Sequence, residues 1–181
     1  QGGAPASVAS IPSTPSVGLV PDEPTMFAPL VDVGQALTPL MQDLTGKGAL
    51  IQRGENFFTE KIDFAAQAGA EFAVIFNNRD ADQRITMAAT DYVAIPAVFI
   101  SQIDGEALRD HIATNGTTMA RLELQKTAAP MIVTDNLSLE HVGLRIKSDH
   151  SRRGDVRITL ISPKGTRSVM QRLNFDNAPG P

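Results

Sequence analysis

The 181-residue sequence predicts an α/β domain followed by a smaller all-β segment. In the first part, short apolar runs alternate with a stretch of helical periodicity, a pattern typical of parallel strands joined by a helix. After residue 130 this periodicity is lost, and apolar residues recur at every second position, as expected of half-buried strands. We therefore predict a boundary between the two parts at residues 126–130.

The first 24 residues are rich in proline and serine, and we expect them to form an extended lead-in. Five prolines are spaced through this stretch in a way that prevents a helix. The apolar run 17–20 could still pair as an edge strand. Folded sequence is expected to begin near Met26.

Residues 48–76 carry the clearest local pattern, which is a strand, a helix and a second strand. Residues 49–51 form the first apolar strand, and Thr59 is the predicted N-cap of a helix with regularly spaced apolar positions. Gly69 stands where a left-handed helix stop is expected, and the apolar run 72–76 follows. This order predicts a βαβ unit with parallel strands.

The remainder of the first part completes a mixed sheet or barrel with two main helices. Residues 79–94 are polar and predict a surface loop, whereas 97–100 form a buried strand. Asp104 is the predicted N-cap of a helix that ends at 115–116. Alternating polar and apolar residues over 119–125 predict a further strand.

The second part, residues 130–181, shows strand periodicity and a concentration of basic residues. One strand face is predicted from Val142, Leu144 and Ile146, and a second from the apolar positions between 156 and 160. Between strands, Ser162–Gly165 has proline where a type I or II turn accepts it.

Composition excludes several classes of function. With a net charge of −4, the chain lacks the broad positive field typical of nucleic-acid-binding proteins, so that function is excluded. No apolar run approaches the ~20 residues of a membrane-spanning helix, which excludes an integral membrane protein. The absence of cysteine excludes disulfides, thiolate zinc sites and cysteine nucleophiles. The three histidines have no zinc-binding spacing, so no metal cofactor other than calcium is expected.

Several blocks of the first part resemble a protease-associated (PA) domain over residues 25–126. The matching segments occur in the family's order and are Gly48–Gly54, Phe57–Phe58, Glu60–Ile62, Ala65–Ala66, Ala68–Ala70, Ala73–Asn78, Ile95–Ser101 and Gly105–Leu108. Glu55–Asn56 departs from the pattern, since many relatives carry a cysteine after the Arg-Gly pair. The resemblance implies a non-catalytic lid or adaptor of a secreted or vacuolar peptidase that binds proteins.

The second part resembles the start of a P domain, the jelly-roll-like β domain that follows the catalytic domain of kexin- and furin-like subtilases. The resemblance is carried by Asp149–Val156 and Leu160–Thr166. The family's later strands have no counterpart before Pro181, and a few strands cannot close a sandwich. We expect either a homo-oligomer or a second, nicked chain to complete this truncated domain.

Two patterns suggest catalysis, but their context argues against it. Asn115–Ala120 resembles the segment around a subtilisin nucleophile, yet Thr118 replaces the serine and no matching Asp and His blocks precede it. Asp149–Ser151 contains the three residue types of a catalytic triad side by side, although triads are assembled from distant segments. No catalytic residue is therefore predicted, and the chain is interpreted as a piece of a serine endopeptidase precursor.

Candidate binding residues are polar positions in predicted loops. The primary function predicted is binding or stabilisation of a protein or peptide outside the cell or in a vacuole. The alternative is a lectin built from the same scaffold, with glycan hydroxyls as ligands, although aromatic residues are few. The candidates are Asn77, Asn78, Asp80, Asp82, Asn115, Arg152, Arg153 and Asp155, with Asp176 added for the lectin alternative.

Three further patterns concern ions, glycans and adhesion. Arg153–Asp155 spells an integrin-type tripeptide, but glycine flanked by charge is also what a turn requires. Asn115 and Asn136 fit the glycosylation acceptor pattern. Candidate calcium ligands are carboxylates and amides near strand ends, namely Asp135, Asn136, Asp149, Asp155, Asp176 and Asn177.

Overall fold

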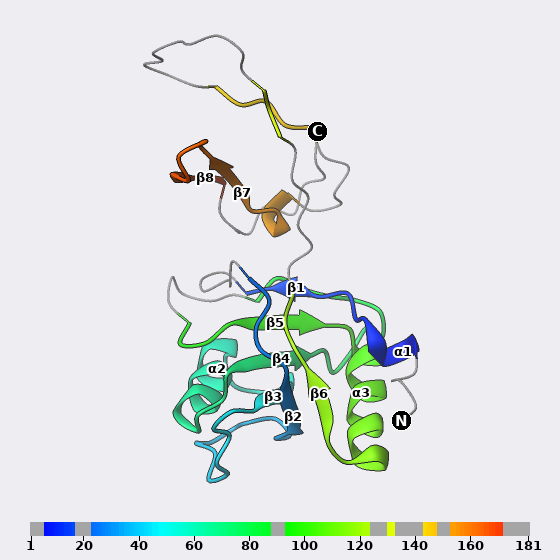
Figure 1. Ribbon diagram of the computed structural model, residues 1–181. Coiled ribbons are helices and arrows are strands. Elements are labelled where there is room, and N and C mark those ends of the chain that lie inside the picture. The colour runs from blue at the N-terminus through cyan, green and yellow to red at the C-terminus, as the bar shows by residue number, and fades with distance from the viewer. Residues whose placement is uncertain are drawn as a thin grey trace.

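Among the residues that the computed structural model describes, three helices are interspersed among six strands through the first two thirds of the chain (Figure 1). The structure describes residues 6–16, 23–87, 93–123, 130–132, 143–147 and 153–171. The elements are α1 (Ala6–Ala9), β1 (Thr14–Pro15), β2 (Ala28–Asp32), β3 (Gly48–Gln52), α2 (Phe58–Gln67), β4 (Phe72–Phe76), β5 (Ala97–Ile100), α3 (Gln102–Asn115), β6 (Thr118–Ala120), the 3-10 helix η1 (Arg153–Asp155), β7 (Ile158–Ile161) and β8 (Arg167–Gln171).

Six strands form one mixed sheet in the order β1-β5-β4-β3-β2-β6. The four inner strands β2, β3, β4 and β5 run parallel, and β1 and β6 close the two edges in antiparallel pairing. The strand–helix–strand unit β3-α2-β4 confirms the predicted βαβ unit. The mixed sheet with its two main helices confirms the predicted fold class of the first part.

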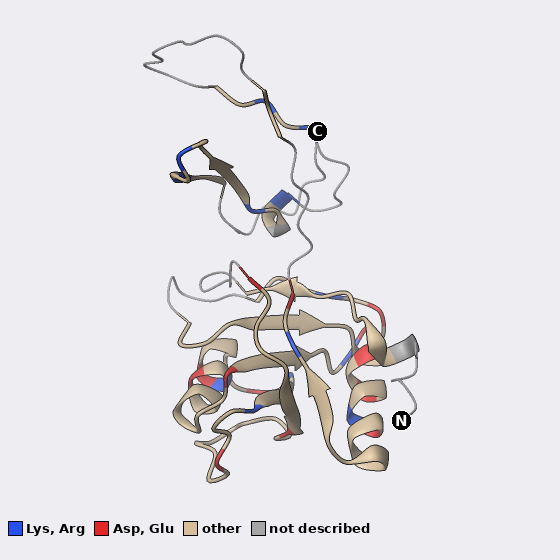
Figure 2. Cartoon of the chain, in the orientation of Figure 1, with Lys and Arg blue, Asp and Glu red and all other residues tan. Residues whose placement is uncertain are grey.

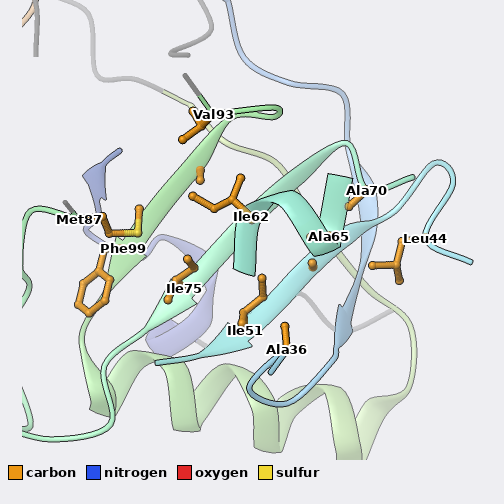
Figure 3. Packing of buried hydrophobic residues seen from close by; sticks show 13 residues of the cluster. Ala36, Leu44, Ile51, Ile62, Ala65, Ala70, Ile75, Met87, Val93 and Phe99 are labelled. Atoms are coloured by element: carbon orange, nitrogen blue, oxygen red, sulfur yellow. The ribbon is translucent and has the colours of Figure 1, made fainter. Parts of the chain in front are cut away.

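Each face of the sheet packs against one main helix, because successive side chains of a strand point to opposite faces. Ile51, Ile75 and Phe99 pack with Ile62 and Ala65 of α2 on one face (Figure 3). The intervening residues of the same strands pack with α3 on the other face, through Leu50, Val74, Phe76, Val98, Ile100 and Leu108. Strands β3, β4 and β5 are buried on both faces, which explains why β4 is an uninterrupted apolar run.

The N-terminal ends of both helices differ from the sequence prediction. The helix α2 begins at Phe58, and the Glu60 carboxylate accepts a hydrogen bond of 3.0 Å from the Phe57 N–H. Thr59 thus lies inside the helix and is not its N-cap. In α3 the N-cap is Ser101 instead of Asp104, and the Ser101 hydroxyl accepts from the Asp104 N–H at 3.1 Å.

The C-terminal ends of both helices were predicted correctly. Gly69 follows α2 with φ of +92°, and Gly116 follows α3 with φ of +74°. Both values lie in the left-handed region, which glycine enters without the steric penalty of a Cβ atom.

The lead-in contributes to the fold, contrary to the prediction that residues 1–24 are only an extended segment without a helix. The short helix α1 forms over Ala6–Ala9, and Val8 and Ile11 pack against the α3 side of the sheet. Strand β1 pairs Thr14 with Phe99 at the edge of the sheet. Proline at position 15 is tolerated there because an edge strand needs no hydrogen bond from that nitrogen. The edge strand predicted at 17–20 lies outside the described residues.

The segment 79–94 is not wholly a surface loop. Its first part, from Arg79 to Arg84, is exposed, but Met87 is fully buried and Val93 nearly so. Both side chains join the cluster under α2. The loop therefore covers one end of the core. Residues 88–92 lie outside the described residues.

The second part contains a β-hairpin. Strands β7 and β8 pair antiparallel, and the Gly165 N–H donates to the Ser162 carbonyl at 2.9 Å, which confirms the predicted turn. The strand predicted around Leu144 and Ile146 is not formed over 143–147. The domain boundary at 126–130 stays a prediction. None of the helices in the described ranges combines the length and the apolarity required to cross a membrane.

Candidate functional site

Three polar residues lie together at the carboxyl edge of the parallel strands. Arg53 follows β3, Asn77 follows β4 and Ser101 follows β5, and parallel strands end at the same edge of a sheet. In open α/β sheets this is the edge where ligands bind. Charged residues are absent from β3, β4 and β5 and gather in the loops and on the helices, as Figure 2 shows.

Asn77 organises this edge from a fully buried position. Its Oδ1 accepts hydrogen bonds from Arg53 Nη1 and from the Asn78 N–H, each at 3.0 Å. Its Nδ2 donates to the Gln83 carbonyl at 3.0 Å. With both ends of its amide engaged, Asn77 holds the loops in place and is not free to bind a ligand.

Arg53 presents the remaining donors of its guanidinium at this edge. Within the described residues, its one side-chain hydrogen bond is to Asn77, so most of its five N–H donors are unused. Burial lowers the pKa of Arg53 from its ordinary value, and the charge of Arg79 lowers it further, while Asp80 raises it. The guanidinium stays protonated, and a fork with this geometry suits a carboxylate or carbonyl oxygen.

The loop after Asn77 has an unusual backbone. Asp80 and Ala81 have φ of +59° and +29°, in a region that non-glycine residues seldom occupy. The Ala81 carbonyl accepts from the Gln102 N–H at 2.9 Å, and the Gln83 N–H donates to the Asp80 carbonyl at 2.7 Å. These bonds fix the loop, so that the side chains of Asn78, Asp80 and Asp82 are exposed on one short segment.

The N-terminus of α3 is already occupied by protein groups. The N–H groups of Gln102 and Ile103 both donate to the Ala81 carbonyl. The next two N–H groups donate to the hydroxyl and the carbonyl of Ser101. The last of these bonds, from Gly105, is the first regular bond of the helix. Three of the four N–H groups that a helix N-terminus normally leaves unpaired, those of Gln102, Ile103 and Asp104, are therefore engaged here.

The edge contains no couple arranged for nucleophilic catalysis among the residues described. The Ser101 hydroxyl donates to Asp104 Oδ2 at 2.6 Å and lacks an imidazole base. His111 lies ten positions further along α3, about 15 Å away by helix rise. In the same described ranges, no group of three metal-ligating side chains is found. The groups present are suited to hydrogen bonding.

A second loop borders the edge and is held by two side chains. Lys61 of α2 is fully buried, and its Nζ donates to the Gln35 carbonyl. Asn56 Nδ2 donates to the Ala36 carbonyl at 2.9 Å, where Ala36 has φ of +47°. Burial lowers the pKa of Lys61, and the neighbouring Glu60 raises it by a smaller amount.

The structure brings together some of the predicted binding residues and separates others. Asn77, Asn78, Asp80 and Asp82 lie in one loop. Asn115 ends α3, about 20 Å away along the helix axis, so it does not share a site with them. It is exposed, and its amide donates to the His111 carbonyl.

The predicted residues of the second part are mostly outside the described ranges. Arg153 is exposed in η1, and the side chain of Asp155 is not described. The predicted positions that lie outside the described residues are Asp135, Asn136, Asp149, Arg152, Asp176 and Asn177. Calcium binding, glycosylation and adhesion thus stay predictions.

Sequence reasoning did not include Arg53 among the binding residues. The available signal was its position directly after a buried strand, a position that Asn77 shares at the end of the next strand of the sheet. Lys61 was also missed as a buried cation, because its helix position alone does not reveal the backbone carbonyl that receives its ammonium group.

Family models match both parts of the chain. A PA domain model matches residues 18–108, and a proprotein convertase P-domain model matches residues 139–178. The solved structure of BSAP, a zinc aminopeptidase from Bacillus subtilis, is 31% identical, with a TM-score of 0.52, and the match covers 64% of this chain and 28% of that chain.

Curated proteins with similar sequences are larger peptidases. A C5a peptidase of Streptococcus pyogenes serotype M3 is 38% identical over 88 residues, which is 49% of this chain and 7% of that protein. The aminopeptidase YwaD of Bacillus subtilis is 37% identical over 89 residues, 48% of this chain and 20% of that protein. A probable leucine aminopeptidase 2 of Aspergillus fumigatus is 42% identical over 83 residues, which is 44% of this chain and 16% of that protein.

This chain therefore spans at most a fifth of the length of these relatives. The mixed sheet, with one main helix on each face, agrees with the sequence matches. The order of the two family models agrees with the order of the two parts of the chain. The chain belongs to the PA domain family, and its PA domain is followed by a proprotein convertase P-domain segment.

Proposed function

We propose that this chain is a non-catalytic recognition module of a secreted peptidase precursor, and that it binds an extended protein segment without cleaving it. The observation that carries the proposal is the carboxyl edge, where a buried amide holds the Arg53 guanidinium and most of its donors have no partner among the described residues. A peptide supplies the carbonyl and carboxylate oxygens that such a fork binds.

The comparisons support the link to peptidases. The PA part of the chain is similar to a small portion of several larger peptidases. The P-domain match makes a subtilase precursor the proposed parent, and a location outside the cell, or in a vacuole, follows from that parentage. The Ser101 hydroxyl donates to Asp104 Oδ2, and His111 lies ten positions further along α3, which supports a role in binding.

The proposal is tested by combining an activity assay with a peptide array. Purified chain is incubated with casein and with fluorogenic aminopeptidase substrates, and no turnover above background is expected. The same chain is applied to an array of 12-residue peptides, where binding should weaken at least about tenfold in Arg53→Gln. Turnover, or peptide binding that is unchanged in Arg53→Gln, would overturn the proposal.

The alternative function is that of a lectin. Asn78, Asp80 and Asp82 are exposed on one fixed loop and could bind sugar hydroxyls. Within the described part of that loop, residues 78–87, there is no aromatic side chain on which a sugar ring could stack. Binding to a glycan array, inhibited by a simple sugar and lost in Asp80→Asn, would favour this alternative.

Completion of the P-domain segment by a homo-oligomer or by a second chain is also proposed. The hairpin β7-β8 is two-stranded among the residues described, and hairpins of that size are marginal on their own. Light scattering after size-exclusion chromatography, with calcium and with a chelator, tests the assembly and the predicted calcium dependence together.

A further inference from the structure

Strand β6 lies at one edge of the six-stranded sheet, and among the described residues it pairs on one side, with β2. Thr118 and Ala120 lie opposite Leu30 and Ala28 of β2, and Met119 lies opposite Pro29. Antiparallel pairs alternate between those that exchange hydrogen bonds and those that do not. Because Pro29 has no N–H, the Met119 pair is of the second kind. The backbone N–H and C=O of Met119 therefore point away from β2.

The neighbouring hydrogen bonds agree with this assignment. Leu122 pairs inward, since its carbonyl accepts from the Thr25 N–H at 2.9 Å and its N–H donates to the Thr25 hydroxyl at 2.8 Å. On the other side of β2, the Val33 N–H donates to the Leu50 carbonyl of β3. The backbone groups of Met119, Arg121 and Glu123 consequently form one outward row. Among the described residues, no strand pairs with this row.

The side chains of the three residues in this row are apolar at Met119 and charged at Arg121 and Glu123. Met119 is 51% exposed. The Arg121 guanidinium lies over the Phe27 ring, 4.7 Å from its centroid, and Phe27 is itself 58% exposed. Arg121 Nη2 also lies 2.6 Å from Glu123 Oε2. Along the edge, the order is thus apolar, basic and acidic at every second residue.

We propose that an extended peptide segment adds to β6 as an antiparallel seventh strand. Its backbone would pair with the outward groups of Met119, Arg121 and Glu123, as in other complexes formed by strand addition. Charge complementarity sets the side chains: a basic residue opposite Glu123, an acidic one opposite Arg121 and an apolar one opposite Met119. This inference rests on the proposed function, because it names the peptide class that such a module would recognise.

A second copy of this chain fits the edge less well than a peptide. An antiparallel pair centred on Arg121 would place the two Arg121 side chains opposite each other, and like charges in that position are destabilising. A shift in register leaves even fewer paired residues of a strand that spans only Thr118–Ala120.

The test uses a fluorescein-labelled capped peptide, Thr-Lys-Thr-Glu-Thr-Val-Thr, whose charges complement the edge. Fluorescence anisotropy should show binding, and a control of the same composition, Thr-Glu-Thr-Lys-Thr-Val-Thr, should bind at least about threefold more weakly because its charges oppose like charges. Equal binding of the two peptides would contradict the assigned register.

Backbone methylation tests strand addition itself. N-methylation of the valine removes the N–H that would bond to the Met119 carbonyl, and binding should fall at least about tenfold. N-methylation of the threonine before it alters an N–H that points to solvent, and binding should be retained. Equal effects of the two methyl groups, or no binding of the parent peptide, would overturn the inference.

Two substitutions of the protein give a matched pair. Met119→Pro removes an outward N–H but no hydrogen bond of the sheet, so binding should be lost at least about tenfold, while Met119→Ala should bind within a few-fold of the original chain. If Met119→Pro fails to fold, the methylated peptides decide. If these tests fail while peptides on the array still bind in a way that depends on Arg53, the strand addition is overturned and the proposed function is not. If the chain forms dimers that are lost in Met119→Pro, the occupant of the edge is a second copy of the chain, and the proposal of a peptide is overturned.

Discussion

Arg53 Nη1 lies 3.0 Å from Asn77 Oδ1, and this hydrogen bond joins the carboxyl ends of two parallel strands. The Arg53 N–H also donates to the Phe76 carbonyl at 2.8 Å. The side chain that looks most available for ligands in the sequence, Asn77, is thus part of the framework. The neighbouring guanidinium is the group that this framework presents.

Loss of the Asn77 amide should destabilise the fold. Asn77→Ala removes three hydrogen bonds from a fully buried position and leaves the Gln83 carbonyl and one Arg53 donor without their partner. We expect the free energy of unfolding to fall by about 2–4 kcal/mol in urea denaturation. Asn78→Ala is the matched control at an exposed side chain and should change it by no more than about 0.5 kcal/mol. Equal effects would contradict the organising role of Asn77.

Burial of Lys61 should make stability depend on pH at alkaline values. Because desolvation lowers its pKa in the folded state below the ordinary 10.5, the unfolded chain binds more protons between those two values. The free energy of unfolding should therefore rise as pH increases through that window. In Lys61→Met this rise should disappear.

The pH dependence is measured by urea denaturation at closely spaced alkaline pH values. Lys47→Met, at a side chain that is only partly buried, is the matched control and should keep the slope of the original chain. A slope that persists unchanged in Lys61→Met would show that another group causes it.

The sign of the effect of Gly105→Ala tests how closely α3 packs on β4. A Cβ at position 105 would lie 2.2 Å from the Cβ and Cγ atoms of Phe76, so helix or ring must move. In a helix without this contact, alanine would stabilise by about 0.5–1 kcal/mol. We expect a loss of about 1–3 kcal/mol instead. Thr114→Ala, on the exposed end of the same helix, should be near neutral, and a stabilised Gly105→Ala would refute the close approach.

The two predicted helix caps can be told apart by substitution. Ser101→Ala removes the hydroxyl that accepts from the Asp104 N–H and should lower stability by about 1 kcal/mol. Thr59→Ala lies within the first turn of α2, where no capping bond from its side chain is formed, and should have a much smaller effect. Thermal denaturation of both variants decides, and the reverse order would restore Thr59 as the cap.

The periodicity of the sequence was sufficient to predict the core of the fold. Apolar runs such as Phe72–Phe76 specify strands buried on both faces, and Gly69 and Gly116 mark helix ends because few other residues adopt their backbone angles. Helix starts were placed less well. Several polar residues near 59 and 104 satisfy the capping pattern, and only tertiary packing selects among them.

The candidate site was predicted in part for a related reason. Strand ends identify the edge at which Asn77 lies, but a sequence does not show whether a polar side chain is buried in a network or free in solvent. Asn115 was grouped with Asn77 on residue type, whereas the length of α3 separates them. The lead-in was misjudged because its prolines hide the fact that Val8 and Ile11 pack on the sheet.

The central claim is that this chain binds an extended peptide without cleaving it, and one time course tests it directly. The anisotropy of the labelled peptide Thr-Lys-Thr-Glu-Thr-Val-Thr is followed for a day after the purified chain is added. The account predicts a rise that stays constant. A decay to below the value of the intact free peptide would show hydrolysis and contradict the claim. The absence of any rise would contradict it too if no peptide on the array binds in a way that depends on Arg53; otherwise it overturns the strand addition alone.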